Sequence, residues 1–215
     1  ISFAVSGHKL LESTATGNRD NPVQVPDHQV SWAAYEELSE PGEVDYYRFT
    51  ANRGEEIYSS IVIPKIDRLS EFAPSFALIG PGLSSNTPTE GELAEILDIR
   101  EGESYINVPY EGGENTVFFE PFTQTSYWER QELRIDAPAD GTYFVAVYHP
   151  AGEVGKYVLA IGEKEVFGPR DILKLPATWW KVRMFVERRF ATYVITGAVL
   201  SGLTVGGFFL ARAIF

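Results

Sequence analysis

The chain has 215 residues, of which 44% are hydrophobic and 13% aromatic, enough for one sizeable folded core. Its formal net charge of −12 is unevenly divided: residues 1–170 hold 28 acidic and 12 basic side chains, whereas residues 171–215 hold 2 acidic and 6 basic ones. An acidic body repels phosphate backbones, which excludes nucleic acid as a partner, and the absence of cysteine excludes disulfides and thiolate chemistry.

Short strands separated by turn residues are expected over residues 24–165, after an N-terminal extension of residues 1–23. Alternating side-chain character predicts strands at about 44–51 and 56–63. Asparagine and glycine at 52–54 predict the turn that joins these two strands.

A further strand is expected at 75–80, where an apolar run ends in Pro and Gly. The stretch that follows, about 84–116, is rich in Ser, Thr, Pro, Gly and Glu and is interpreted as an irregular insertion. Within it, TEGELAEILD predicts one short helix, with Thr89 and Glu92 forming a capping box.

The later part of this region predicts a β-hairpin. A polar run at 131–136 is followed by the turn PADG at 138–141 and by a strand of strict alternation at 142–149. Another strand is expected at 156–163. Together these elements predict an all-β, jelly-roll-like antiparallel sandwich.

Two stretches carry a resemblance to a known family. They are GEVDYYRFTANRGEEIYSSIVI at 42–63 and PADGTYFVAVYHPAGEVGKYVLAIG at 138–162. Both resemble the bacterial pre-peptidase C-terminal (PPC) domain, over about two thirds of the chain. The shared features are core aromatics and turn glycines, which mainly specify fold. The resemblance implies an exported sandwich of the kind that accompanies secreted enzymes, some relatives of which bind calcium or fibrous protein.

Catalytic chemistry is not predicted. The three histidines, His8, His28 and His149, have no partner at metal-ligand spacing. The sequence also lacks the motifs of serine hydrolases, zinc proteases, P-loops and dinucleotide-binding folds. We therefore expect a protein that is not an enzyme and needs no cofactor.

Acidic side chains crowd the loop before the strand at 44–51. Carboxylate oxygens are calcium ligands, which makes Glu43 and Asp45 the candidates for a calcium site. The neighbouring carboxylates are Glu36, Glu37 and Glu40. Because their spacing lacks a regular ligand register, a solvated acidic rim is the favoured interpretation.

Several aromatic side chains offer a second kind of binding surface. Tyr127 and Trp128, with Trp32 and Tyr35 elsewhere, would stack on sugars if exposed, although packing inside the sandwich is favoured. The run FFEPF at 118–122 would cover a sheet edge or dock against a neighbouring subunit.

Residues 166–189 predict a connector and an amphipathic helix at a membrane interface. Pro176 suits the first turn of that helix. Basic side chains alternate with apolar ones, so anionic headgroups are the expected counterions, and aromatic rings suit the headgroup level. The residues concerned are Trp179, Trp180, Lys181, Arg183, Arg188, Arg189 and Tyr193.

Residues 190–212 predict a transmembrane helix. Their charge-free stretch, FATYVITGAVLSGLTVGGFFLA, has 22 residues, which at about 1.5 Å per residue cross a bilayer. Small residues spaced four apart allow another helix to approach closely. These helix-packing candidates are Gly197, Ser201, Gly202 and Gly206.

Two signals disagree about orientation. Four basic residues precede the span and Arg212 follows it, which by the positive-inside rule favours a cytoplasmic sandwich. The PPC resemblance implies export, with a signal sequence upstream of Ile1. We follow the resemblance and expect a single-pass protein whose residues 1–170 are periplasmic or otherwise extracytoplasmic.

The function expected from these features is that of a non-catalytic accessory subunit of a larger bacterial membrane complex. Its partners would be other integral membrane subunits and a bilayer with anionic headgroups. The alternative is a cell-surface module that binds glycan, protein or calcium. The short, partly apolar connector favours the subunit, because a freely displayed module needs a polar, flexible stalk.

Overall fold

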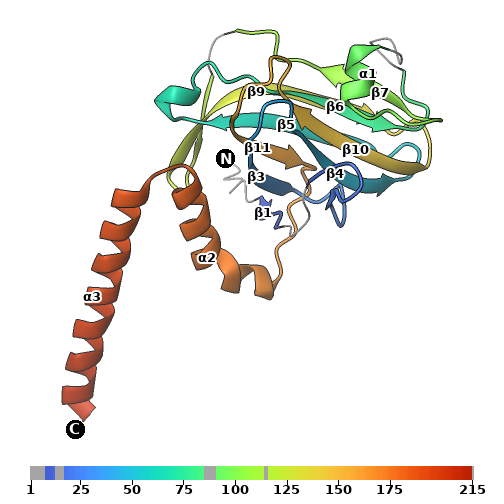
Figure 1. Cartoon of the computed structure of the whole chain (residues 1–215). Helices are drawn as coiled ribbons and strands as arrows, with labels where there is room; N and C mark the ends of the chain where they lie inside the picture. The colour runs from blue at the N-terminus through green and yellow to red at the C-terminus, as the bar shows by residue number, and fades with distance from the viewer. Residues whose placement is uncertain (1–7, 13–16, 85–90, 114–115, 215) are drawn as a thin grey trace.

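Two packed β-sheets make up the body of the protein in a computed structural model that describes residues 8–12, 17–84, 91–113 and 116–214 (Figure 1). The strands are β1 (Lys9–Leu10), β2 (Val23–Gln24), β3 (Trp32–Leu38), β4 (Val44–Ala51), β5 (Glu56–Pro64), β6 (Ser75–Gly80), β7 (Ser104–Val108), β8 (Val117–Glu120), β9 (Thr125–Asp136), β10 (Gly141–Tyr148) and β11 (Gly155–Ile161). The helices are the short 3₁₀ turn η1 (Asp67–Leu69), α1 (Glu92–Ile96), α2 (Pro169–Phe185) and α3 (Arg189–Ile214).

The predicted β-sandwich is confirmed. Sheet A has the strand order β1-β3-β11-β5-β9-β8, and sheet B has the order β2-β4-β10-β6-β7. Both sheets are mixed, because β1 runs parallel to β3 and β2 runs parallel to β4, whereas the other pairs are antiparallel. The N-terminal extension thus contributes β1 to sheet A.

The predicted hairpin over residues 131–149 is wrong. Strand β9 pairs with β5 and β8 in sheet A, whereas β10 pairs with β4 and β6 in sheet B, so the turn between them crosses from one sheet to the other. Both strands bury one face in the same core. The alternating pattern follows from that burial alone, so it does not predict which strand is the hydrogen-bonded neighbour.

The core lies between the inner faces of the two sheets. Large side chains that are fully buried there include Tyr47, Phe76, Tyr143, Tyr157 and Ile61. Alternate residues of β10 and β11 point inward, as the period-two pattern predicts. Burial of this apolar area is the main stabilising contribution to the sandwich.

Each sheet also has a partly covered outer face. The insertion provides α1 and β7, and Leu97 at the end of α1 packs against Ile79 and Tyr148 on sheet B. Helix α1 begins after Gly91, and Thr89 of the expected capping box lies outside the described residues. On sheet A, Val186 at the end of α2 packs against Ala33, the strand residue Val158 and the ring of Tyr127.

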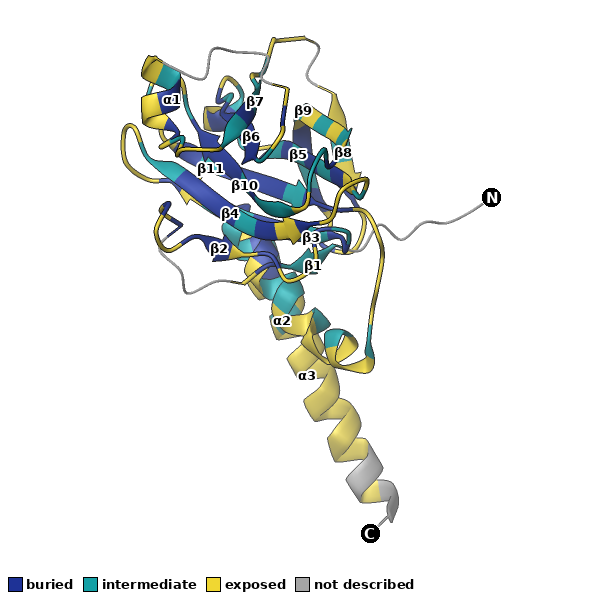
Figure 2. Ribbon diagram, turned by 90° about the vertical axis from the view of Figure 1, so that its right-hand side faces the viewer, coloured by how far each residue is buried: buried dark blue, intermediate teal, exposed yellow. Residues whose placement is uncertain are grey.

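Helix α2 begins earlier than expected. Its first residue is Pro169, where the Asp171 carboxylate accepts a hydrogen bond from the Gly168 amide at 2.8 Å, and Pro176 lies in the helix interior. The cap and the favourable first-turn position of Pro169 explain this start. Figure 2 shows α3 extending away from the sandwich, with most of its described residues coloured as exposed. Helix α2 contacts sheet A at its C-terminal end, and near its start Asp171 forms an ion pair with Lys9 of β1 at 2.9 Å.

Candidate functional site

The junction between the sandwich and the two C-terminal helices is built around a buried arginine. Arg183 is 3% exposed, and its guanidinium donates to the Thr123 carbonyl oxygen at 2.7 Å and to Thr192 Oγ1 at 3.0 Å. Thr192 in turn donates to the Arg188 carbonyl oxygen at 2.7 Å, and the Arg183 guanidinium lies 4.8 Å from the ring centre of Trp179. One side chain therefore joins α2, α3 and the β8–β9 loop.

Hydrogen bonds within the β8–β9 loop hold the Thr123 carbonyl group in place for Arg183. Glu120 is buried and accepts hydrogen bonds from the backbone amides of Phe122 at 2.9 Å and Thr123 at 2.6 Å, as well as from the Thr123 hydroxyl. The hydroxyl of Thr125 lies 2.7 Å from that of Thr123 and donates to Tyr127 at 2.9 Å. This buried chain of polar groups fixes the loop against sheet A.

A second set of contacts holds the turn between α2 and α3. Glu187, which has a positive φ of 63°, accepts hydrogen bonds from Arg68 at 2.6 and 3.0 Å and from Lys156 at 2.9 Å. Hydrogen bonds from Lys156 and then Arg68 lower the pKa of the Glu187 carboxyl group. Lys156 also donates to the Phe185 carbonyl oxygen at 3.0 Å, so the turn is bound to β11 and to η1.

The two helices form an antiparallel hairpin beside the sandwich (Figure 1). Trp180 of α2 and Tyr193 of α3 meet edge to face with ring centres 5.7 Å apart. Farther from the sheets, a groove of about 420 Å³ separates the helices, with Leu175 and Pro176 on one side and Val199 on the other. Helix α2 thus runs alongside α3, and its turn end rests on sheet A.

Helix α3 is long and apolar enough to cross a membrane. Residues Arg189–Phe209 have a mean hydropathy of 1.5, and only 6% of the most apolar stretch is buried in the structure. A core helix of a soluble domain is mostly covered, whereas the described residues of α3 are largely exposed. Gly197, Gly202 and Gly206 lie on open surface, with no atom within 4 Å of the position that a Cβ would occupy, and Ser201 is exposed.

The residues expected at a membrane interface have different surroundings. Lys181 is exposed and forms an ion pair with Glu12, and Arg188 and Arg189 are exposed. Arg183 differs from the expectation, because it points inward and is satisfied by protein groups. Trp179 and Trp180 are half-buried between α2 and α3.

The calcium candidates have internal partners. Glu43 accepts hydrogen bonds from the Ser39 amide and hydroxyl and from the Glu40 amide, which closes its own loop. Asp45 is 8% exposed and accepts a hydrogen bond from the Tyr157 hydroxyl at 2.6 Å. Among the described residues, no group of three or more His, Asp or Glu side chains is arranged to hold a metal ion.

The surroundings of Asp45 shift the pKa of its carboxyl group strongly. Burial raises the pKa of its carboxyl group to about 7, with further raising by Glu43 and Glu36 and an opposing effect of the Tyr157 hydroxyl. That hydroxyl also lies 2.7 Å from the hydroxyl of Tyr47. The three groups form a buried polar cluster in the core rather than an exposed ligand site.

The histidines serve local structure. His8 Nδ1 lies 2.6 Å from the hydroxyl of Ser31. His28 stacks on Phe49 with ring centres 5.2 Å apart, and His149 stacks on Phe72 at 5.4 Å. The first contact places a hydroxyl within hydrogen-bond reach of an imidazole nitrogen, as in a nucleophile–base pair, but Ser31 is buried, with 4% of its surface exposed.

The aromatic candidates divide into buried and exposed groups. Tyr127 and Trp128 are buried, which favours the packing interpretation over sugar stacking. In the FFEPF run, Phe119 and Phe122 are exposed, and Phe122 also lines the groove between α2 and α3. This run therefore keeps an apolar surface available at the helix end of the sandwich.

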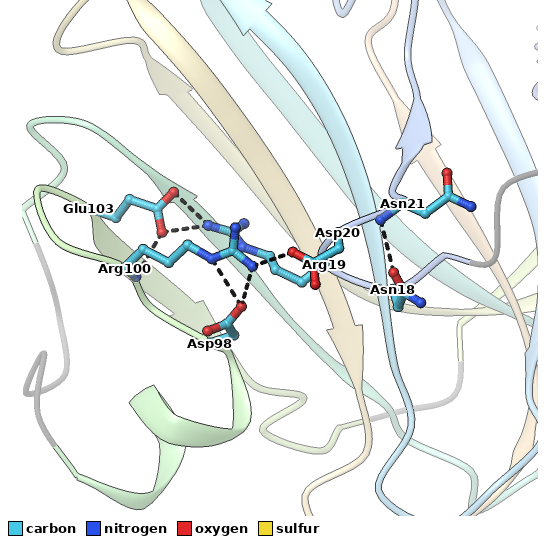
Figure 3. A network of polar contacts seen from close by, with 7 residues as sticks. All are labelled: Asn18, Arg19, Asp20, Asn21, Asp98, Arg100 and Glu103. Carbon is cyan, nitrogen blue, oxygen red and sulfur yellow. Dashed lines mark hydrogen bonds and ion pairs between the residues drawn. The ribbon is translucent and has the colours of Figure 1, made fainter.

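A network of charges that sequence reasoning missed lies near α1 (Figure 3). Arg19 is buried, forms an ion pair with Glu103 and has its guanidinium 3.7 Å from the ring centre of Phe144. Next to it, Arg100 bonds to Asp20 at 2.8 Å and to Asp98 at 2.7 Å. Two of these contacts, Arg19 with Glu103 and Arg100 with Asp20, join residues about 80 positions apart in sequence. A local sequence motif therefore could not predict them.

A cleft separates α2 from the outer face of sheet A. It has a volume of about 340 Å³. Its apolar lining includes Phe122, Phe167, Ile172, Leu175 and Val182, with polar groups at one end. The cleft shares Phe122 and Leu175 with the groove between α2 and α3.

Comparison with known proteins gives only distant likenesses. No protein-family model matches the chain, and no curated protein matches it. Among solved structures, PliG of Aeromonas hydrophila, a periplasmic lysozyme inhibitor of g-type lysozyme, has 16% identity and a TM-score of 0.36, covering 65% of this chain and 94% of its own. The pre-peptidase C-terminal domain of a collagenase from Bacillus anthracis has 11% identity and a TM-score of 0.33, covering 65% and 90%.

A third structure, the secreted copper-binding protein MopE of Methylococcus capsulatus, has 11% identity and a TM-score of 0.24, covering 56% of this chain and 70% of its own. Likenesses at these scores do not bear on function. The sandwich itself rests on the strand pairing described above, and kinship with PPC domains stays a prediction.

Proposed function

We propose that this protein is a non-catalytic, membrane-anchored accessory subunit of a larger membrane complex, with a PPC-related sandwich outside the cytoplasm that makes protein contacts. The observation that carries the proposal is the buried Arg183 at the junction. A tether that only keeps a binding module near a membrane needs no fixed angle between module and anchor. Here Arg183 and Glu187 join the anchor to three separate parts of the sandwich.

The unpartnered surface of α3 supports a helix partner. Its small residues lie on open surface, and close approach of another helix there would gain van der Waals contact. Exposed Phe119 and Phe122 add apolar area at the same end of the sandwich. A docked neighbour would cover both surfaces together.

Purification of the native protein in a mild detergent, followed by native mass determination, tests this proposal. Stoichiometric integral membrane partners are expected. Because the chain has no cysteine, single cysteines can then map the contact: Gly202→Cys and Gly206→Cys should cross-link to a partner, and Phe208→Cys on another face of α3 should not. A monodisperse single chain without partners would refute the subunit role.

Placement outside the cytoplasm has its own test. Ala151→Cys in the exposed β10–β11 loop should react with a membrane-impermeant maleimide in intact cells. Labelling only after lysis would reverse the orientation.

The alternative, a surface binding module, is favoured by one observation. A groove of about 280 Å³ on the outer face of sheet A is lined by Tyr35, Tyr58, Glu129 and Glu163. If the purified chain proves to be alone, glycans and basic peptides are the ligands to screen against this groove, because rings and carboxylates suit them.

A further inference from the structure

The cleft between α2 and sheet A has one apolar and one polar end. Phe122, Phe167, Ile172 and Leu175 give an apolar wall on the side of the helices. At the other end lie His8, Tyr35, Glu120 and Glu165. Its volume of about 340 Å³ is within the usual range of small-molecule sites, roughly 300–1,000 Å³.

The cleft adjoins the groove beside the candidate membrane helix. Phe122 and Leu175 also line the groove between α2 and α3, whose remaining lining is almost entirely apolar. With α3 in a bilayer, that groove faces lipid chains. An acyl chain held in the cleft would therefore lie next to the lipid chains that this groove faces.

The charges around the polar end define the headgroup. Glu120 and Glu165 line both the cleft and the adjoining groove on sheet A, and neither lining includes a Lys or Arg among the described residues. An ammonium group complements this end. A second cavity shares His8 and Thr178 with the cleft and is lined by Lys174, which complements a phosphate. The other charged groups of this cavity form two ion pairs, Lys9 with Asp171 and Lys181 with Glu12.

We propose that this cleft binds one zwitterionic phospholipid, with an acyl chain against α2, the ammonium group against Glu120 and Glu165, and the phosphate toward Lys174. The site rests on the membrane attachment proposed above but not on the subunit role, because a lipid occupies it whether or not other chains are bound. Such a lipid fills the space that separates α2 from sheet A and so supports the angle of the anchor.

Native mass spectrometry of the full chain in mild detergent tests the site. The probes are phosphatidylethanolamine and phosphatidylglycerol with identical acyl chains, added in equal amounts. One ethanolamine lipid per chain should be retained in preference to the glycerol lipid. Absence of a retained lipid, or preference for the glycerol lipid, would overturn the proposal.

Two variants on one helix separate the cleft from general lipid binding. Leu175→Trp fills the cleft and should reduce the retained lipid at least fivefold, whereas Leu173→Trp, at a position that is 81% exposed, should leave it unchanged. Equal retention by both variants would overturn the site. If Leu175→Trp does not fold, Thr178→Phe blocks the same cleft.

The headgroup contact is tested by Glu165→Gln. Removing one partly exposed charge should reduce the preference for the ethanolamine lipid roughly two- to fivefold while a lipid is still retained. An unchanged preference would show that the carboxylates do not select the headgroup.

Discussion

Replacing Arg183 by Met should loosen the contact between the two C-terminal helices and the sandwich without unfolding the sandwich. The substitution keeps most of the side-chain volume but removes hydrogen bonds to the Thr123 carbonyl oxygen and to Thr192 Oγ1. Hydrogen bonds to a charged group contribute about 1.5–3 kcal/mol each, and the buried charge that is removed had its own desolvation cost. The net loss should be about 2–3 kcal/mol in the free energy of docking.

Hydrogen exchange at the turn measures that loss. The amides of Val186, Arg188 and Thr192 donate to carbonyl groups within the turn and the adjoining helix ends at 2.9–3.0 Å. A loss of about 2–3 kcal/mol should accelerate their exchange roughly 30- to 150-fold. Exchange in the core strand β10 should not change, because its pairs with β4 and β6 do not involve α2.

The matched control is Arg188→Met, which removes the same charge from an exposed side chain on the same turn. Its effect on exchange should be within about twofold of the wild type, since exposed charges contribute little. If Arg183→Met and Arg188→Met behave alike, the buried network does not hold the anchor, and the reasoning behind the fixed junction is refuted.

Two further predictions concern the sandwich. The pKa of Asp45 is raised from 3.8 to about 7 in the folded state, so the folded protein binds the proton more tightly, and the free energy of unfolding should fall as pH rises from about 4 to 7, by a few kcal/mol at most. Thermal melts across this range should show the slope, and Asp45→Asn should flatten it; a slope retained by the variant would contradict the assignment. Gly162→Ala should lower the free energy of unfolding by at least about 2 kcal/mol in denaturant titrations, because φ is +70° and an added Cβ would lie 2.4 Å from the carbonyl oxygens of His28 and Val30. Gly54→Ala, at a φ of +85° in open space, is the control and should cost about half as much or less, so equal costs would rule out the clash.

The strands were predictable because their cause is local. Alternation along residues 142–148 follows from burial of one face of β10, and the structure confirms a strand there. The partner of that strand was not predictable, since a four-residue turn serves equally to reverse within a sheet or to cross between sheets. The start of α2 was missed because Pro169 and Pro176 both suit a first turn, and the cap from Asp171 to Gly168 decides between them.

The candidate site was less predictable than the fold. Nothing local distinguishes Arg183 from Arg188, although the first is buried and the second exposed. The difference arises because Thr123 and Thr192 come to lie beside Arg183, and they are 60 and 9 residues away. The cleft likewise arises from the position of α2 against sheet A, and its polar end combines residues as far apart in sequence as His8 and Glu165.

Burial of Arg183 also weakens the argument from basic residues that the sandwich lies in the cytoplasm. The positive-inside rule counts the four basic residues before the apolar span that begins at Phe190 and explains them by topology. In the folded protein, Arg183 joins the helices to the sandwich and Lys181 pairs with Glu12, so the fold itself accounts for both. Of the four, only Arg188 and Arg189 then have no role in the described fold that accounts for their charge. Two exposed basic residues beside the span are a weaker argument for a cytoplasmic sandwich than four. For the same reason, Arg188 and Arg189 are the two basic side chains that we still expect to contact anionic headgroups.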